Sequence, residues 1–454
     1  MQDNSGRCAL VILAAGQGSR MNSDLPKVLH PLGGVPLVAH AIAAGLTQAP
    51  SRIVVVTGHG AEAVESAVAE IEPAAICARQ AEQLGTGHAV LQAKGALEGF
   101  EGDVIVLYGD TPFISEDTLE NLRAARATHD IVMLGFEAAD PGRYGRLIME
   151  GERLTRIVEA KDATPEELAI RLCNSGLLCA DATTLMELLS VVGNDNASGE
   201  HYLTDVPAIA AAKGLTATAV TCDEAETLGI NTRAELADAE RLFQTRRRAE
   251  MFDNGVTMTA PETVFFALDT WIGGDTVIEP NVVFGPGVTV ENAATIRAFS
   301  HLEGAHVGAG AIVGPYARLR PGAELGNGAR IGNFVEVKAA EIGEGAKVNH
   351  LSYIGDASIG ARSNIGAGTI TCNYDGVFKH RTDVGADVFV GSNTMLVAPV
   401  TLGDGAMTGS GSVITRDVPP GDLAIGRARQ ENKDGLGARM MSRLRALKSK
   451  QKGH

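Results

Sequence analysis

Aromatic residues and long apolar stretches are both scarce in this chain of 454 residues. Phe, Tyr and Trp together make up 4% of the sequence, with a single Trp. No run of 18 apolar residues occurs, so a membrane-spanning helix is not expected. The opening residues, MQDNSGRC, lack the pattern of a signal peptide, and the six Cys include no CxxC pair. These absences predict a cytoplasmic protein with free thiols and no membrane partner.

An excess of positive charge is also missing. Lys and Arg number 39 against 55 Asp and Glu, which gives a formal net charge of −16. This balance argues against nucleic acid as a partner. Basic residues do gather near the carboxyl end, where they predict a solvated tail: Arg439, Arg443, Arg445, Lys448, Lys450 and Lys452. The length of the chain is sufficient for two or three domains, each with a core of its own.

The first half of the chain alternates between short apolar runs and stretches suited to helices. Residues 8–14, CALVILA, are apolar throughout, as expected of a strand buried in a parallel sheet. Further strands are predicted at 52–58, 74–80, 103–114 and 130–140. Strands that alternate with helices indicate a doubly wound, Rossmann-like α/β sheet, whose ligands lie beyond the carboxyl ends of the strands.

A glycine-containing loop follows the first predicted strand. It reads AAGQGSRM and continues into NSDLPKVLH, so a strand, a loop and a helix succeed one another. Backbone N–H groups of such loops bind phosphates, and Gly16 and Gly18 allow a ligand to approach closely. Arg20 and Lys27 would add positive charge. A tight turn between strand and helix explains the same spacing.

Asp110 stands where the apolar run of the strand predicted at 103–114 gives way to polar residues. A carboxylate at the carboxyl end of a strand suits a hard cation such as Mg²⁺ that bridges phosphates. A helix cap is the alternative for an Asp in this position. The apolar strand, the glycine loop and Asp110 taken together favour phosphate binding.

The second half repeats an aliphatic residue every six positions. The series begins Val307, Val313, Leu319, Leu325, Ile331 and Val337 and resumes at Ile342 after a slip of one residue. A period of six fits neither a helix nor an isolated strand, and it is the signature of a parallel β-helix. Such a stack can be a scaffold or a trimerisation post only. The repeat is interrupted by residues 370–383, which must leave the coil as an external loop.

Polar residues at outward positions of the repeat suggest acyl transfer. His350 lies between the aliphatic residues Val348 and Ile354, and histidine is the residue type best suited to act as a base for an attacking amine. A surface histidine with a purely hydrogen-bonding role is the competing interpretation. Neighbouring hexads contribute further outward groups: Arg320, Glu336, Lys338, Tyr353 and Asn364.

Ordered motifs in the first half resemble those of a known enzyme family. LAAGQGSRM…PK (13–27) is similar to the signature of the nucleotide-diphospho-sugar pyrophosphorylases. The likeness narrows through QAEQLGTGHAV (80–90), YGD (108–110), YGR (144–146), VEAKD (158–162), NSG (174–176) and IN (230–231). The set resembles the bifunctional N-acetylglucosamine-1-phosphate uridyltransferase / glucosamine-1-phosphate N-acetyltransferase family from about residue 8 to about residue 430.

This resemblance implies a two-site enzyme that makes UDP-N-acetylglucosamine, a precursor of bacterial peptidoglycan and lipopolysaccharide. Acetyl-CoA would acetylate glucosamine 1-phosphate, and the resulting N-acetylglucosamine 1-phosphate would react with UTP to release pyrophosphate. Asp110 and Asn231 would bind Mg²⁺. The implied nucleotide and sugar contacts are Leu13, Ala14, Ala15, Gly16, Arg20, Lys27, Gln80, Gly85, Thr86, Tyr108, Gly109, Asp110, Gly145, Glu159, Asn174 and Asn231.

For the second half, the resemblance implies a left-handed parallel β-helix whose acetyltransferase site lies between neighbouring chains of a homotrimer. His350 would be the general base, with Arg320, Glu336, Lys338, Tyr353 and Asn364 as substrate contacts. The family often has Ala where Ser410 stands, and it commonly reads SRVPQ where this chain reads GRARQ around Arg427. The implied acetyl-CoA contacts are Ala367, Asn373, Tyr374, Ser392, Ser410 and Arg427.

Four segments are predicted. They are a uridyltransferase domain at 1–232, a helical linker at 233–255, an acetyltransferase β-helix at 256–430 and a basic tail at 431–454. The main alternative is a single-activity sugar-nucleotide pyrophosphorylase whose β-helix only assembles the oligomer. A non-catalytic binder that kept the fold is the third hypothesis.

Overall fold

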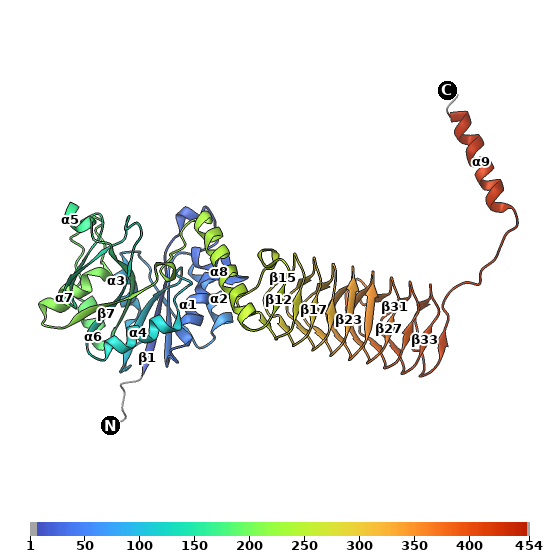
Figure 1. Ribbon diagram of the computed structural model, residues 1–454, viewed down its shortest axis with the longest axis horizontal. Helices are drawn as coiled ribbons and strands as arrows, with labels where there is room; N and C mark the ends of the chain where they lie inside the picture. The colour runs from blue at the N-terminus through green and yellow to red at the C-terminus, as the bar shows by residue number, and fades with distance from the viewer. Residues whose placement is uncertain (1–6, 452–454) are drawn as a thin grey trace. The chain divides into compact units, whose positions relative to one another are not determined.

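The computed structural model describes residues 7–451. Lys452 of the predicted basic tail lies outside this range. The chain divides into two compact units (Figure 1). The first holds the residues up to Ala249 together with Phe266–Leu268, and the second holds Glu250–Phe265 and the chain from Asp269 on.

The first unit is built on a nine-stranded mixed sheet. Seven strands follow one another in the order β11-β7-β10-β6-β1-β4-β5, and β8 pairs with β10 and β9. Neighbours β6, β1, β4 and β5 are parallel, whereas β10 runs antiparallel to β6 and β7. The bounds are β1 Cys8–Ala14, β4 Arg52–Thr57, β5 Ile76–Arg79, β6 Asp103–Tyr108, β7 Ile131–Glu137, β8 Arg146–Glu150, β9 Arg153–Val158, β10 Leu172–Asp181 and β11 Ala217–Cys222.

Helices cover both faces of this sheet, which confirms the doubly wound class. Alternate residues of β1 enter different cores: Val11 lies with Val90 of α3 and Val206 of α7, whereas Ile12 lies with Val38 of α1. Because both faces are buried, β1 can be apolar at every position. The helices are α1 Leu37–Leu46, α2 Ala61–Ile71, α3 Thr86–Leu91, α4 Glu116–Arg126, α5 Pro165–Leu168, α6 Ala182–Leu189 and α7 Val206–Ala212.

The helix expected at 233–255 spans Arg233–Asp253 and is labelled α8. Its apolar residues Ala239 and Phe243 are buried against Leu37 and Phe113 of the first unit. The side chain of Gln244 exchanges hydrogen bonds of 2.8 and 2.9 Å with the backbone of Phe266. The greater part of α8 is therefore a packed element of the first unit.

The second unit is a left-handed parallel β-helix, whose short strands form a regular stack from β12 (Thr257–Met258) to β35 (Leu423–Ala424) (Figure 1). Successive coils pair in register at 17 or 18 residues, as between Ile312 and Arg330. The six-residue series from Val307 to Val337 is buried in its core. The repeat thus predicted both the strands and the residues that fill the prism.

Part of the segment 370–383 leaves the coil, as the sequence predicts, although the two ends of the segment are strands of the stack. Tyr353 on β26 (Tyr353–Ile359) pairs with Ile370 on β28 (Ile370–Cys372), 17 residues later. Ala357 on the same strand pairs with Thr382 on β29 (Thr382–Val384), 25 residues later. The additional residues form an exposed loop, in which Val377 is 74% exposed.

The last helix, α9, spans Leu436–Gln451, and its described side chains are exposed. It includes most of the predicted basic tail. Within residues 7–451, none of the helices combines the length and apolar character needed to cross a membrane.

The coils approach so closely at several glycines that a side chain has no space. A Cβ on Gly343 would lie 2.7 Å from the backbone nitrogen of Ala361 in the next coil. Gly343→Ala is therefore expected to destabilise the β-helix by about 1–3 kcal/mol and to lower its Tm, measured by differential scanning calorimetry. Gly437→Ala in α9, where a Cβ meets nothing within 4 Å, is the control. An unchanged Tm in Gly343→Ala would contradict the prediction.

Candidate active sites

The carboxyl ends of β1 and β6 meet at one edge of the sheet, because Leu13 pairs with Tyr108. A cavity of about 280 Å³ opens there. Ten residues of the predicted nucleotide set line it: Leu13, Ala14, Ala15, Gly16, Lys27, Gln80, Gly85, Thr86, Tyr108 and Asp110. Segments distant in sequence are therefore brought together as predicted. Val28, Gln83, Ala89 and Glu200 complete the lining and were not singled out by the motifs.

Lys27, Asp110 and Asn231 form one polar cluster at this cavity. The Lys27 ammonium donates to the Asp110 carboxylate and, at 3.0 Å, to Oδ1 of Asn231. The Lys27 and Asp110 side chains are only 13% and 16% exposed. Two side-chain oxygens from distant parts of the chain thus lie close enough to share a single cation.

The N-terminus of α8 fixes the position of Asn231. Thr232 caps the helix by accepting a hydrogen bond of 3.2 Å from the backbone N–H of Glu235. The Glu235 carboxylate in turn accepts from the backbone N–H groups of Asn231 and Thr232 at 2.7 and 2.9 Å. Asn231 is therefore held by a rigid helix end, and the backbone N–H of Ile230 donates to the carbonyl of Asp110 at 3.0 Å.

A second cavity, of about 620 Å³, shares Thr86, Tyr108 and Glu200 with the first. Three predicted sugar contacts line it: Gly145, Glu159 and Asn174. The two cavities therefore adjoin, as the sites for the two halves of a nucleotide sugar must. Residues that motif spacing did not reveal also line it, among them Arg143, Lys161, Tyr202 and Thr204.

Glu159 is held in this second cavity by Thr204, whose hydroxyl donates to its carboxylate at 3.0 Å. Burial raises the pKa of Glu159, although the bond from Thr204 opposes the shift. Burial likewise raises the pKa of the Tyr108 phenol well above its ordinary value. A Cβ on Gly176, where φ is 92°, would lie 2.7 Å from the Tyr108 ring. Glycine is therefore required there for Tyr108 to keep its place.

Three predicted residues lie outside the linings of the two cavities: Asn231, described above, and two others. Arg20 is exposed on the short 3₁₀ turn Ser19–Met21, and Gly109 follows β6 with its backbone N–H bound to the carbonyl of Leu13 at 2.9 Å. Neither is among the residues that line the two cavities. Asn231 lies in the loop that leads into α8.

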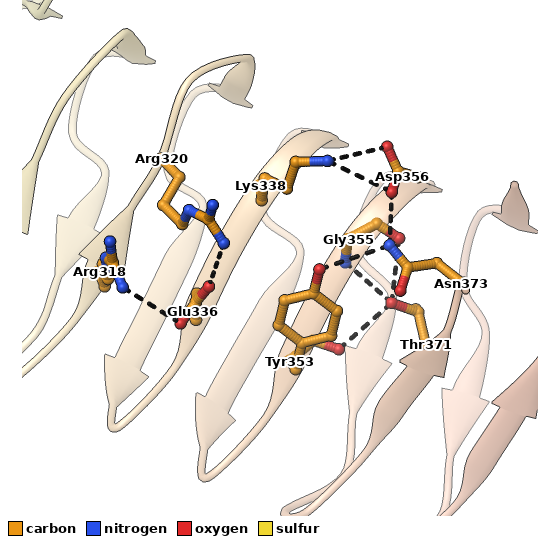
Figure 2. Close-up of polar contacts among 9 residues, drawn as sticks. All are labelled: Arg318, Arg320, Glu336, Lys338, Tyr353, Gly355, Asp356, Thr371 and Asn373. Atoms are coloured by element: carbon orange, nitrogen blue, oxygen red, sulfur yellow. Dashed lines mark hydrogen bonds and ion pairs between the residues drawn. The ribbon is translucent and has the colours of Figure 1, made fainter. Parts of the chain in front are cut away.

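On the β-helix, β21 (Arg318–Leu319), β24 (Glu336–Ile342) and β26 place polar side chains in register. Arg320 donates to Glu336 at 2.8 Å, and Arg318 lies 4.0 Å from the same carboxylate. Figure 2 shows these groups beside a second cluster around Asp356. The structure therefore brings Arg320, Glu336, Lys338 and Tyr353 to one face, as predicted.

The external loop adds Asn373 and Lys379 to this face. The Asn373 amide donates to the Asp356 carboxylate and, at 3.4 Å, to the Tyr353 hydroxyl. Lys379, which the motifs did not indicate, lies beside Lys338, and the proximity of that ammonium lowers the pKa of Lys379. The pKa of Lys338 is raised by its contact with Lys379 and by the Asp356 carboxylate. Tyr374 is exposed, and its hydroxyl donates to the carbonyl of Gly376 at 2.6 Å.

His350 ends β25 (Lys347–His350) and pairs in register with Asn333 of β23 (Arg330–Asn333) in the coil before. Its Nδ1 lies 2.8 Å from Oδ1 of Asn333. Because Oδ1 only accepts, Nδ1 carries the hydrogen in the neutral ring, and Nε2 keeps a lone pair for a proton. The motifs did not indicate Asn333; its offset of one coil from His350 is the signal that could have found it.

Four of the predicted coenzyme residues lie in one column that continues from His350, whereas Asn373 and Tyr374 belong to the external loop. Backbone N–H groups in this column donate to backbone carbonyls of the preceding coil: Gly368 to His350 at 3.1 Å, Asn393 to Ala367 at 2.7 Å and Gly411 to Ser392 at 2.8 Å. Ala367, Ser392 and Ser410 therefore lie one above another. A Cβ on Gly411 would lie 3.7 Å from the Arg427 side chain, which places Arg427 at the same column. Asn364 lies on β27 (Asn364–Ile365), in register with Lys347.

The fold and these two clusters define a nucleotidyltransferase domain joined to a hexapeptide-repeat transferase. Residues 10–173 match the model of the MobA-like NTP transferase domain, and residues 304–339 and 381–416 match that of the bacterial transferase hexapeptide (six repeats).

Full-length relatives identify the family within this class. The chain is 68% identical to the bifunctional protein GlmU of Jannaschia sp., over 99% of both chains. It is 69% identical to that of Ruegeria pomeroyi, over 98% of this chain and 99% of the relative. It is 65% identical to that of Dinoroseobacter shibae, over 97% and 98%. The chain belongs to the GlmU family of bifunctional proteins, and it is an enzyme with nucleotidyltransferase and acyltransferase domains.

Proposed function

We propose that this enzyme makes UDP-N-acetylglucosamine in two steps at separate sites. The β-helix acetylates glucosamine 1-phosphate with acetyl-CoA, and the α/β domain joins the product to the uridylyl group of UTP with release of pyrophosphate. One observation carries the first step: the His350 column and the Asp356 cluster both stand on outer surfaces of the β-helix. A trimerisation post needs neither of them.

In the acetyl transfer, the amine of glucosamine 1-phosphate attacks the thioester carbonyl of acetyl-CoA. A C–N bond forms, the C–S bond breaks, and the sulfur leaves as the thiol of CoA. His350 accepts the amine proton at Nε2, because its Nδ1 is bound to Asn333. Arg320, Lys338 and Lys379 offset the phosphate charge, and backbone donors that are not engaged between coils stabilise the oxyanion. Tyr353 contacts the sugar. Asn373, which the resemblance implied as an acetyl-CoA contact, lies beside the Tyr353 hydroxyl and is assigned to the sugar here.

In the uridylyl transfer, a phosphate oxygen of N-acetylglucosamine 1-phosphate attacks the α-phosphorus of UTP. This chemistry depends on positioning and charge rather than on a protein nucleophile. Gln80, Gly85 and Thr86 bind the uracil, Gly16 and Lys27 bind the phosphates, and Gly145, Glu159 and Asn174 hold the sugar. Arg20, exposed on the turn that follows the glycine-containing loop, adds positive charge for the phosphates.

Asp110 and Asn231 are suited to bind Mg²⁺. Their oxygens already converge on the Lys27 ammonium, and oxygen ligands together with phosphate oxygens and water suit this ion. No group of three or more His, Cys, Asp or Glu suited to a metal occurs among residues 7–451, so the substrate's phosphates would complete the shell. The bound ion would neutralise charge that develops on the pyrophosphate.

The exposed position of His350 supports a homotrimer in which a neighbouring chain closes the acetyl-transfer site. In this assembly the external loop and the Arg427 segment reach the coenzyme. The product serves as a precursor of bacterial cell-wall polymers. The alternative, a single-activity pyrophosphorylase, predicts that no CoA is released with glucosamine 1-phosphate.

The two activities are expected to differ in their need for metal. Excess EDTA should lower pyrophosphate release from UTP and N-acetylglucosamine 1-phosphate at least about 100-fold, because the phosphate charge is no longer neutralised. Thiol release from acetyl-CoA and glucosamine 1-phosphate should stay unchanged. Added MgCl₂ should restore the first activity. Absence of thiol release under all conditions would contradict the two-step proposal and favour the single-activity alternative.

A further inference from the structure

The Asp356 carboxylate connects several side chains of the proposed acetyl-transfer site. It accepts from the Asn373 amide and lies 3.4 and 3.5 Å from the Lys338 ammonium. The same amide nitrogen reaches the Tyr353 hydroxyl at 3.4 Å. Figure 2 shows Asp356 between the strand that carries Lys338 and the loop residue Asn373. None of the motifs pointed to Asp356.

The backbone on both sides of this contact is fixed. Asp356 has φ of 47°, a left-handed conformation that Asp and Asn tolerate better than most residues. The buried Thr371 hydroxyl lies 2.8 Å from the backbone N–H of Gly355 and 3.1 Å from its carbonyl, which ties β26 to β28. The Asp356 side chain is 21% exposed. It is therefore well placed to orient its neighbours.

A carboxylate can only accept hydrogen bonds, and this determines the direction of the whole network. Asn373 must turn its NH₂ group toward Asp356, and the second amide hydrogen points to the Tyr353 oxygen. Two groups then remain for a ligand. Oδ1 of Asn373 can accept a hydrogen bond, and the Tyr353 hydroxyl hydrogen can be donated.

We propose that Asp356 is a positioning residue of the acetyl-transfer site, which orients the Asn373 amide and the Tyr353 hydroxyl toward the substrate and holds Lys338 for its phosphate. The inference rests on the proposed function. In this arrangement the substrate's amine N–H donates to Oδ1 of Asn373, so the nitrogen lone pair stays directed at the thioester. The Tyr353 hydroxyl donates to an oxygen of the sugar or its phosphate.

Asp356→Asn tests the proposal with little change in shape. Asn is nearly isosteric and tolerates the left-handed conformation, but its amide lets Asn373 turn over. We expect kcat/KM for glucosamine 1-phosphate to fall about 10- to 100-fold, with pyrophosphate release unchanged. Asp387→Asn is the matched control, since Asp387 has φ of 56° and pairs with Arg362 in an exposed ion pair at 2.5 Å. Its thiol release should remain at the wild-type value.

The exchange variant Asp356→Asn/Asn373→Asp separates positioning from structural support. It restores an amide–carboxylate pair but reverses its direction, so position 373 presents a carboxylate and not an amide carbonyl. If Asp356 only stabilised the coil and the Asn373 amide made no contact with the substrate, the exchange would restore both Tm and thiol release. We expect it to restore the Tm while thiol release stays at least about 10-fold below wild type.

Three outcomes overturn the inference, and they are distinguishable. Normal thiol release in Asp356→Asn, or its recovery in the exchange variant, overturns the positioning role while the proposed function stands. Absence of thiol release in the wild-type enzyme overturns the proposed function, and the inference with it.

Discussion

His350→Ala is expected to reduce CoA release with glucosamine 1-phosphate by about 10²–10⁴-fold, the usual contribution of a general base. Because Nδ1 of His350 is bound to Asn333, Nε2 of the imidazole remains available to accept the amine proton. Alanine offers no proton acceptor. Thiol release can be followed with a chromogenic disulfide under saturating acetyl-CoA. Pyrophosphate release from UTP should remain at the wild-type rate, because it takes place in the other unit.

His306→Ala is the control for this result. His306 also lies on the β-helix and is paired with Glu291 at 3.1 Å, but it belongs to a different sheet from His350. Its loss should leave thiol release unchanged. Thiol release near the wild-type rate in His350→Ala would show that another group takes the amine proton, and the assignment of the base would be wrong.

Asp110→Asn is expected to lower pyrophosphate release by about 10²–10³-fold, the effect usually seen when one preorganised electrostatic group is removed. The substitution keeps the shape of the side chain but removes the negative charge that holds Lys27 and would bind Mg²⁺. Initial rates at several MgCl₂ concentrations would show a higher requirement for the metal. Thiol release should be unaffected.

Asp103→Asn provides a matched control, because Asp103 begins the same strand β6 at the opposite edge of the sheet. Its carboxylate pairs with Arg126 at 3.1 Å and lies away from the cavity lining. Pyrophosphate release should be close to wild type in this variant. If Asp103→Asn and Asp110→Asn lowered pyrophosphate release equally, the negative charge of Asp110 would act on the stability of the domain and not on the reaction.

Much of the site could be predicted because its residues lie in short motifs next to elements with a clear pattern. The apolar run of β1 located the edge at which Leu13, Gly16 and Asp110 meet, since parallel strands deliver their carboxyl ends together. The residues that the sequence pattern did not reveal make contacts between distant segments. Thr204 reaches Glu159 across 45 residues, and Lys379 reaches Lys338 from the external loop.

By itself, the sequence determined two patterns: a buried strand followed by a phosphate-type loop, and an aliphatic residue every six positions. These patterns decide which side chains enter the core, because burial depends on local geometry that repeats along the chain. Only the tertiary structure decided which outward side chains form hydrogen bonds with one another. The pairings of His350 with Asn333 and of Asn373 with Asp356 depend on coil register and on a loop of irregular length. Hydrogen bonds require heavy atoms within about 3 Å, a distance that no sequence spacing specifies.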